Sequence, residues 1–270
     1  MPVQRKPAPT VPPPLRLPKL VVRLRNAAMT DLPAPAADLL DRASLFLDFD
    51  GTLVDFVIDP NKATVDDPLR ALLGRLAQRL DGRFAILSGR SLDELTDRIG
   101  LGPIAMAGSH GLERRDGDGH VTRAPTPPGL AIATDAARAF ADQQGLLLEV
   151  KAAGVAIHYR DAPHNEPLVD EFARALATRT HLELQSGKCV RELKVPGADK
   201  GDAVRAFMTE PPFASGRPVV MGDDLTDEHA FEAAAALGGC GVLIGDPRPT
   251  AAHFRLPTVD STLAFLGAAE

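Results

Sequence analysis

Two carboxylates follow an apolar run in the first quarter of the chain. Asp48 and Asp50 come directly after residues 44–47 and stand just before Gly51. Because a strand projects alternate side chains to one side, carboxylates two residues apart converge at the point where the strand ends. Such a pair can hold a hard cation beside a reacting group. An ordinary acidic turn after a buried strand has the same local pattern, so the choice depends on the rest of the chain.

A second apolar run, residues 84–87, is followed by Ser88 and Gly89 and then by the helical pattern of residues 91–99. The start of a helix offers main-chain N–H groups that no residue of that helix accepts. Together with a serine hydroxyl, these donors suit a phosphate. Alone, the signal is weak.

Two further segments carry charge at predicted element ends. Lys200 opens the predicted helix 199–208, although Asp199 can be a simple helix cap and Lys200 a solvated first-turn residue. A third apolar run, residues 218–222, ends in four carboxylates within residues 223–228. These charges repel one another unless a cation or solvent compensates, so a divalent metal is the simplest explanation.

The order of these segments is an acidic pair, Ser-Gly, Lys-Gly and an acidic cluster, and three of the four directly follow predicted strands. In this the chain resembles the haloacid dehalogenase superfamily of aspartate-nucleophile phosphatases, with its four motifs in sequence order. The resemblance implies a doubly wound, parallel-sheet α/β core with its catalytic groups at the carboxyl ends of the strands.

The same resemblance implies a role for each motif residue. Asp48 is the expected nucleophile, and Asp50 the expected general acid and later general base. Mg²⁺ is expected on the Asp48 carboxylate, the Asp50 main-chain carbonyl and Asp223, with Asp224 and Asp227 orienting its surroundings. The expected phosphate ligands are Gly51, Thr52, Ser88, Gly89 and Lys200, of which Lys200 is also counted as catalytic.

The roughly one hundred residues between the second and third motifs are too many for a loop in a compact domain, which predicts an inserted domain. Its pattern predicts a small α+β cap. The expected elements are helices at 130–143 and 167–178, strands at 146–150 and 154–159, and a hairpin of 181–185 and 189–193 around residues 186–187. The expected division is a disordered segment 1–40, a core of 41–112 and 196–270, and a cap of 113–195.

Residues 108–113, 149–151, 158–160 and 187–192, together with 222–228, resemble trehalose-6-phosphate phosphatase. The resemblance implies hydrolysis of trehalose 6-phosphate to trehalose and phosphate, the last step of trehalose synthesis. Aromatic residues make up 4% of the chain and Trp is absent, so charged hydrogen bonds must recognise the sugar. The candidate substrate-binding residues are Arg90, His110, Glu113, Glu149, Lys151, His158, Arg160, Lys188 and Glu192.

Each cap residue also allows a purely structural interpretation: Glu149 and Lys151 as an exposed ion pair, and His158 or Tyr159 as satisfied core groups. Other functions remain open as well. They are another sugar-phosphate phosphatase, a phosphomutase, or a non-catalytic sugar-phosphate-binding regulator. The intact motif set argues against the last.

Bulk composition narrows the partners. The net charge of −6 argues against nucleic acid, and no apolar run approaches the length of a membrane span. Cys189 and Cys240 lie in different predicted domains, which argues against a disulfide framework or a zinc site. A monomeric cytoplasmic enzyme with a small-molecule substrate is expected.

The N-terminal segment differs from the rest. Nine of the 24 prolines lie in its first 35 residues, and six Lys or Arg precede the first acidic residue, Asp31. Such a composition predicts disorder. Translation starting at Met29, a basic arm and a targeting signal are the alternatives, although the apolar stretch of a secretory signal is missing.

Overall fold

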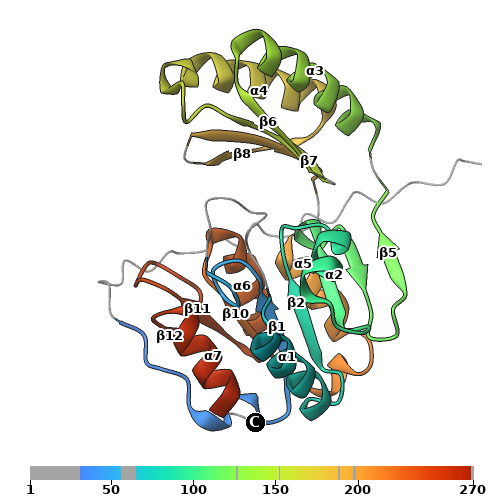
Figure 1. The fold of residues 1–270 in the computed structure, drawn as a ribbon, viewed down its shortest axis with the longest axis vertical. Coiled ribbons are helices and arrows are strands. Elements are labelled where there is room, and N and C mark those ends of the chain that lie inside the picture. Colours follow the sequence, from blue (N-terminus) through green and yellow to red (C-terminus); the bar gives the residue numbers. More distant parts are fainter. Residues whose placement is uncertain are drawn as a thin grey trace, which may run out of the picture.

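The computed structural model describes residues 31–55, 65–125, 127–151, 153–187, 189–196 and 199–268. These residues form two sheets, each covered by helices (Figure 1). The larger sheet has eight strands: six pair in parallel, and two more are joined to one edge by antiparallel pairing. The smaller sheet has four antiparallel strands. The predicted α/β core with an inserted α+β cap is confirmed.

The first strand occupies the middle of the core sheet and is buried along its whole length. A strand covered on both faces reads as a continuous apolar run, which is why residues 44–47 lack alternation. The core strands, in spatial order, are β12 (Phe254–Leu256), β11 (Cys240–Ile244), β10 (Arg217–Gly222), β1 (Ala43–Asp48), β2 (Phe84–Leu87), β3 (Ala105–Gly108), β4 (Glu113–Arg115) and β5 (Val121–Arg123).

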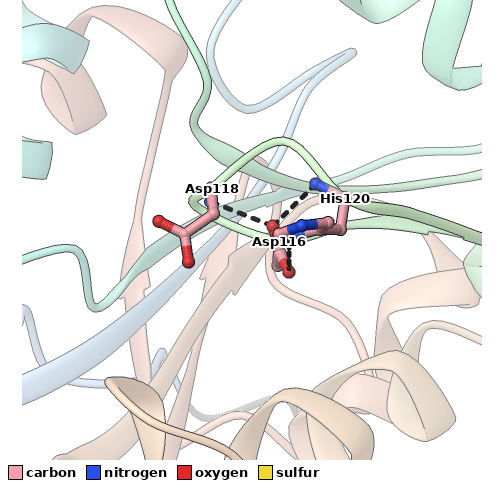
Figure 2. A group of neighbouring side chains, drawn as sticks. All are labelled: Asp116, Asp118 and His120. Carbon is pink, nitrogen blue, oxygen red and sulfur yellow. Dashed lines mark hydrogen bonds and ion pairs between the residues drawn. The ribbon is translucent and has the colours of Figure 1, made fainter.

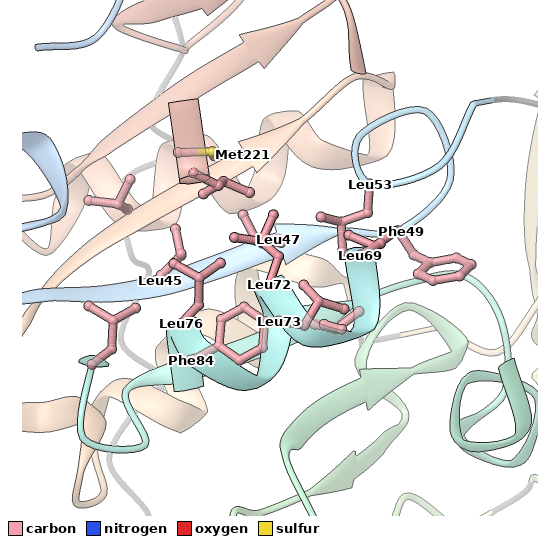
Figure 3. Packing of buried hydrophobic residues seen from close by; sticks show 14 of the residues in the cluster. Leu45, Leu47, Phe49, Leu53, Leu69, Leu72, Leu73, Leu76, Phe84 and Met221 are labelled. Carbon is pink, nitrogen blue, oxygen red and sulfur yellow. The ribbon is translucent and has the colours of Figure 1, made fainter. Parts of the chain in front are cut away.

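Helices cover both faces of the core sheet, so alternate residues of β1 enter different clusters. Leu45 and Leu47 pack with one group of helices (Figure 3), whereas Phe46 packs with the other. The first group of helices is α1 (Asp67–Arg79), α2 (Leu92–Ile99) and α7 (Val259–Ala268), and the second is α5 (Lys200–Met208) and α6 (Glu228–Ala236).

No helix within the described ranges is long and apolar enough to cross a bilayer.

The cap packs two helices against one face of its sheet and turns the other face toward the core (Figure 1). Val155 and Ile157 point to the helices and are fully buried. The strand order is β6 (Leu147–Lys151), β7 (Gly154–His158), β9 (Val190–Lys194) and β8 (Glu183–Gly187), and the helices are α3 (Pro128–Gln144) and α4 (Glu166–Thr180). The predicted hairpin turn was centred on residues 186–187. In the structure these residues end β8, and the turn follows Gly187.

The predicted cap boundary at residue 113 is wrong. Strands β4 and β5 pair antiparallel with the edge of the core sheet at β3, and the second sheet with its helices begins only at Pro128. Residues 116–119, Asp-Gly-Asp-Gly, form the turn between these two strands. Such Asp-Gly turns are typical of hairpins, so the sequence contained this signal.

The prediction of disorder up to residue 40 is also wrong for its last ten residues. Leu39 and Leu40 are buried in the core cluster, and the Arg255 main-chain N–H donates to the Pro33 carbonyl at 3.0 Å. The Asp31 carboxylate accepts from Arg255 Nε at 2.6 Å. Composition averaged over a proline-rich stretch hid this apolar pair. The predicted disorder of residues 1–30 lies outside the described residues.

Leu40→Ala tests whether residues 31–40 belong to the core. Leu40 is 1% exposed, so its truncation is expected to lower the free energy of unfolding by about 2–5 kcal/mol. Leu237, which is 45% exposed, supplies the control, and Leu237→Ala should change that energy by about 0.5 kcal/mol at most. Urea unfolding followed by circular dichroism measures both. Equal midpoints for Leu40→Ala and the wild type would contradict a core role.

Candidate active site

The three strand ends that carry motif residues meet because β10, β1 and β2 are neighbours in the sheet and run parallel. Asp48 is the last residue of β1, Ser88 directly follows β2, and Asp223 directly follows β10. Parallel strands end on the same edge of a sheet, which is the usual location of sites in this architecture. The structure thus brings together motifs that lie up to 175 residues apart, from residue 48 to residue 223.

A buried lysine links the first and last motifs. Lys200, the first residue of α5, donates from Nζ to Asp48 Oδ1 and to Asp227 Oδ1, at 2.6 Å each. All three side chains are almost fully buried. Burial, Asp227 and Asp223 raise the pKa of Asp48 against the opposing effect of Lys200. Burial disfavours the ammonium, but the two carboxylates outweigh it and raise the pKa of Lys200, which stays charged.

The acidic cluster places a third carboxylate beside this pair. Carboxylate oxygens of Asp48, Asp223 and Asp227 all lie within 4.8 Å of one another. Burial and the Asp227 charge raise the pKa of Asp223 to about 6. Asp223 Oδ1 is buried and has no hydrogen-bond partner within the described structure. An unpartnered oxygen among crowded carboxylates fits a divalent cation.

Of the two residues predicted to bind phosphate after Asp50, Gly51 shapes the space beside Asp223. Gly51 has φ +88°, and a Cβ there would lie 2.2 Å from Asp223 Oδ2, so only glycine lets the carboxylate approach. Thr52 is fully buried, and its hydroxyl has no partner among the described atoms. Both positions are adjacent to Asp50, as the sequence predicts.

Asp50 is held by Arg90 in a two-pronged ion pair. Arg90 donates from Nε to Asp50 Oδ2 and from Nη2 to Oδ1, at 2.6 Å each, and its guanidinium lies 5.7 Å from the centre of the Phe49 ring. The hydrogen bonds to Asp50 raise the pKa of Arg90. Arg90 was expected to bind substrate. The structure instead joins it to the expected general acid.

Ser88 contacts the main chain of the same arginine: its hydroxyl accepts the Arg90 N–H at 3.1 Å. Helix α2 offers fewer open donors than predicted. Ser91 and Glu94 form a reciprocal cap, and the Leu92 N–H donates to another side chain. The predicted phosphate contact therefore depends on Ser88 and the neighbouring Gly89.

Glu113 and His110 follow β3 and have different surroundings. The Glu113 carboxylate accepts from Ser109 Oγ at 2.9 Å, the Leu92 N–H at 3.1 Å and Arg123 Nε at 3.0 Å. Both of its oxygens are thus engaged within the core, and the geometry favours a supporting role over the predicted sugar contact. His110 is half-buried, and its partial burial together with nearby lysines lowers its pKa to about 3, so the imidazole is neutral.

Charged residues share the core-facing side of the cap sheet. Lys151 Nζ donates to Glu192 Oε2 at 2.9 Å and lies 4.0 Å from Glu149 Oε2. His158 Nε2 lies 3.0 Å from the same Glu149 oxygen, and this hydrogen bond lowers the pKa of Glu149. Arg160 is exposed beyond β7. Lys188 lies outside the described residues, so its predicted contact stays a prediction.

A pocket joins the two parts of the site. His110 and Gly89 line it from the core, and Lys151, Glu192 and Lys194 line it from the cap. Lys194 was missed by the sequence predictions, although it stands two residues after Glu192 and so on the same face of β9. Polar groups from both sheets therefore face one space.

A second acidic cluster lies in the β4–β5 turn and is explained by the turn itself. Asp116 Oδ1 accepts the main-chain N–H groups of Asp118 and His120 at 2.9 Å each, and its Oδ2 lies 3.2 Å from His120 Nδ1 (Figure 2). The Asp118 and His120 side chains are exposed. These contacts are typical of an aspartate-stabilised turn, and they give no separate reason for a ligand.

Known structures share this architecture. A haloacid dehalogenase-like hydrolase from Bacteroides thetaiotaomicron is similar to 84% of the chain, with a TM-score of 0.62 and 15% identity over 98% of its own length. The C-terminal domain of trehalose-6-phosphate phosphatase from Candida albicans is similar to 88% of the chain, with a TM-score of 0.72 and 22% identity over 97% of that domain. The fold is that of the haloacid dehalogenase-like hydrolases.

Sequence comparison is more specific. The family model described as trehalose-phosphatase matches residues 46–260. A probable trehalose-phosphate phosphatase of Sinorhizobium fredii is 39% identical over 78% of this chain and 80% of its own. The trehalose-6-phosphate phosphatase of Escherichia coli is 37% identical over 88% of this chain and 90% of its own. The chain belongs to the trehalose-phosphatase family.

Asp223→Asn tests the crowding of the acidic cluster. The raised pKa, about 6 against an ordinary 3.8, means that the folded protein binds this proton more tightly than the unfolded chain. The stabilisation that the protonated Asp223 carboxyl provides is therefore present at low pH. It is lost as the pH rises from the ordinary pKa of 3.8 through the raised pKa of about 6. At neutral pH without metal, the variant should melt about 2 °C or more above the wild type, and the gap should close below about pH 4.

Added Mg²⁺ completes this test by differential scanning fluorimetry. It should stabilise the wild type and have little effect on the variant, because the variant lacks one carboxylate ligand. An equal rise in melting temperature in both proteins would show that Asp223 is not a ligand of the cation.

Proposed function

We propose that this protein is a Mg²⁺-dependent phosphatase that hydrolyses trehalose 6-phosphate to trehalose and inorganic phosphate. One observation carries the chemical part of the proposal: a buried Asp48 at the end of β1, bonded to Lys200 and crowded by Asp223 and Asp227. Membership of the trehalose-phosphatase family supports the choice of substrate.

Asp48 acts as the nucleophile. One of its oxygens attacks phosphorus, forming the aspartyl-phosphate bond while the bond from phosphorus to the sugar oxygen breaks. Lys200 holds Asp48 in place and supplies a fixed positive charge for phosphate oxygens. At about 4 Å and an effective dielectric constant near 20, one such charge contributes roughly 4 kcal/mol, so it is one of several effects required.

Asp50 supplies a proton to the departing sugar oxygen and later accepts one from the water that hydrolyses the intermediate. Arg90 bonds both oxygens of this carboxylate in the structure, so one of these bonds must open before Asp50 carries the proton that it donates. Ser88 and Gly89 complete the cradle for the phosphate. Arg90 therefore contributes by orienting the general acid.

The oxygen ligands suit Mg²⁺, because carboxylates, a carbonyl and water are the donors that this cation prefers. Asp48, the Asp50 main-chain carbonyl and Asp223 would hold it. When bound, it offsets the repulsion between an anionic nucleophile and an anionic phosphate. Asp227 fixes the geometry of this cluster by accepting the main-chain N–H groups of Asp223 and Asp224 at 3.0 Å each.

The cap provides recognition of the sugar. Trehalose presents many hydroxyl groups and little apolar surface, so it needs paired charged acceptors and donors. Glu149, Lys151 and Glu192 supply these on the face that looks toward the phosphate site. The neutral His110 adds a group of the core to the same pocket. Closure of the cap over the core would exclude water while the sugar is bound.

Phosphate release from a panel of sugar phosphates tests the substrate. Trehalose 6-phosphate should give the highest kcat/KM, with inorganic phosphate as the product. Preference for another sugar phosphate would favour a different phosphatase of the same superfamily. Transfer of phosphate to a second sugar position would indicate a phosphomutase, and binding without turnover would indicate a regulator.

Asp48→Asn tests the nucleophile. The change keeps the shape of the side chain and removes its charge, so phosphate release should fall to near background, with folding retained by circular dichroism. Wild-type protein quenched in acid during turnover should carry a covalent phosphoryl group by mass spectrometry, and the variant should not. A variant with normal turnover would exclude Asp48 as the nucleophile.

Glu192→Ala tests recognition by the cap. Loss of one charged hydrogen-bond partner, with its mates left unpaired, should lower kcat/KM for trehalose 6-phosphate by about 10²-fold. With p-nitrophenyl phosphate, which lacks the sugar, the rate should stay within about twofold of wild type, because transfer itself is untouched.

Glu171→Ala provides the control for Glu192→Ala, since Glu171 is exposed on the cap helix α4, which covers the opposite face of the sheet. Glu171→Ala should leave the rates with both substrates unchanged, whereas Lys200→Ala should lower both rates. Equal losses on both substrates for Glu192→Ala would assign Glu192 to folding or to cap closure.

A further inference from the structure

The main chain of Asp223 and Asp224 is held from two opposite directions. On one side, Asp227 Oδ2 accepts both of their N–H groups at 3.0 Å. On the other side, Arg248 Nη2 donates to the Asp223 carbonyl at 3.2 Å and to the Asp224 carbonyl at 2.9 Å. The two N–H groups and the two carbonyls of Asp223 and Asp224 are therefore all hydrogen-bonded to a side chain. Arg248 forms two of these four bonds.

Arg248 belongs to the connection between β11 and β12 and is itself fixed by Glu228, the first residue of α6. Its Nη1 forms an ion pair with Glu228 Oε1. The same carboxylate accepts from the Thr250 hydroxyl, at 2.9 Å to Oε1, and from the Ala251 N–H, at 2.7 Å to Oε2. The Arg248 and Glu228 side chains are only 22% and 18% exposed. The connection is thus bonded to residues 223–227, the acidic loop that follows β10.

We infer that Arg248, anchored by Glu228, is a positioning residue that sets the Asp223 carboxylate for the divalent cation; this inference rests on the proposed function. Mg²⁺ requires near-ideal octahedral geometry and short oxygen distances, so a small shift of one ligand is costly. Arg248 offers no oxygen to the cation. It acts through the main chain that carries the ligand.

The contacts distinguish this arrangement from an ordinary ion pair. An exposed Arg–Glu pair adds little to stability and has no effect on a neighbouring site. Here the guanidinium bonds two successive carbonyls of the loop that provides Asp223, while Asp223 Oδ1 is itself left without a partner. The loop is therefore rigid at its main chain and open at one carboxylate oxygen, as a preformed ligand requires.

Arg255, in the strand β12 that follows this connection, provides a matched control. Its Nη1 donates to the Gly245 carbonyl at 2.7 Å, and its Nε donates to Asp31 at 2.6 Å. It therefore braces the start of the connection, at Gly245, with the same kinds of contact. None of its contacts given by the described structure reaches the acidic loop.

The experiment measures Mg²⁺ binding to the full chain by isothermal titration calorimetry, with Arg248→Gln and Arg255→Gln compared with the wild type. Loss of a group that orients a metal ligand typically weakens affinity by about 10–100-fold, and this is expected for Arg248→Gln. Arg255→Gln should lower the melting temperature without changing the Mg²⁺ Kd. At saturating Mg²⁺, Arg248→Gln should keep its KM for sugar phosphate within about twofold of wild type, because the cap is intact.

Glu228→Gln adds a coupling test. If Glu228 acts through Arg248, the double variant should bind Mg²⁺ no more weakly than Arg248→Gln alone. An unchanged Mg²⁺ Kd in a folded Arg248→Gln, or an equal loss in Arg255→Gln, would overturn the inference and leave the proposed function standing. A wild type that binds no Mg²⁺ would overturn both.

Discussion

The catalytic centre depends on one buried ammonium group. Lys200 lies between Asp48 and Asp227, and without it these carboxylates would be uncompensated charges in a site almost closed to water. Removing one partner of such a buried group typically costs about 3–5 kcal/mol. The same charge keeps Asp48 aligned at the end of β1. One interaction therefore supports the fold at the motif junction and orients the proposed nucleophile, Asp48.

The lysine compensates only part of the negative charge, and the remainder defines what the site can bind. Asp223 keeps an unpartnered oxygen and a raised pKa, so the cluster favours a bound proton and offers carboxylate oxygens that suit a cation. Asp227 and Arg248 hold the main chain of the acidic loop while this carboxylate oxygen stays open. All three carboxylates of this cluster belong to the core and none to the cap. The helices of the cap bury one face of its sheet, and the other face keeps the charged groups that are proposed to bind a polyhydroxylated substrate.

Local sequence patterns determined much of the protein. Apolar runs ending in Asp48, Ser88 and Asp223 predicted three parallel strands with their polar ends together, because fully buried strands leave a clear signal. The helix at Lys200 and the elements of the cap were predicted within a few residues of their observed bounds. The alternation of Glu149 and Lys151 likewise predicted a shared face. These signals depend on neighbours along the chain, which the sequence displays directly.

Contacts between distant segments were decided only by the tertiary structure. The sequence could not show that Arg90 would grip Asp50, that Glu113 would be occupied within the core, or that Arg248 would bond the carbonyls of the acidic loop. The β4–β5 hairpin was assigned to the cap although its Asp-Gly turn is visible in the sequence, because short polar edge strands resemble loops until a sheet edge pairs with them. A charged side chain has several possible partners along a chain, and only packing in three dimensions selects one of them.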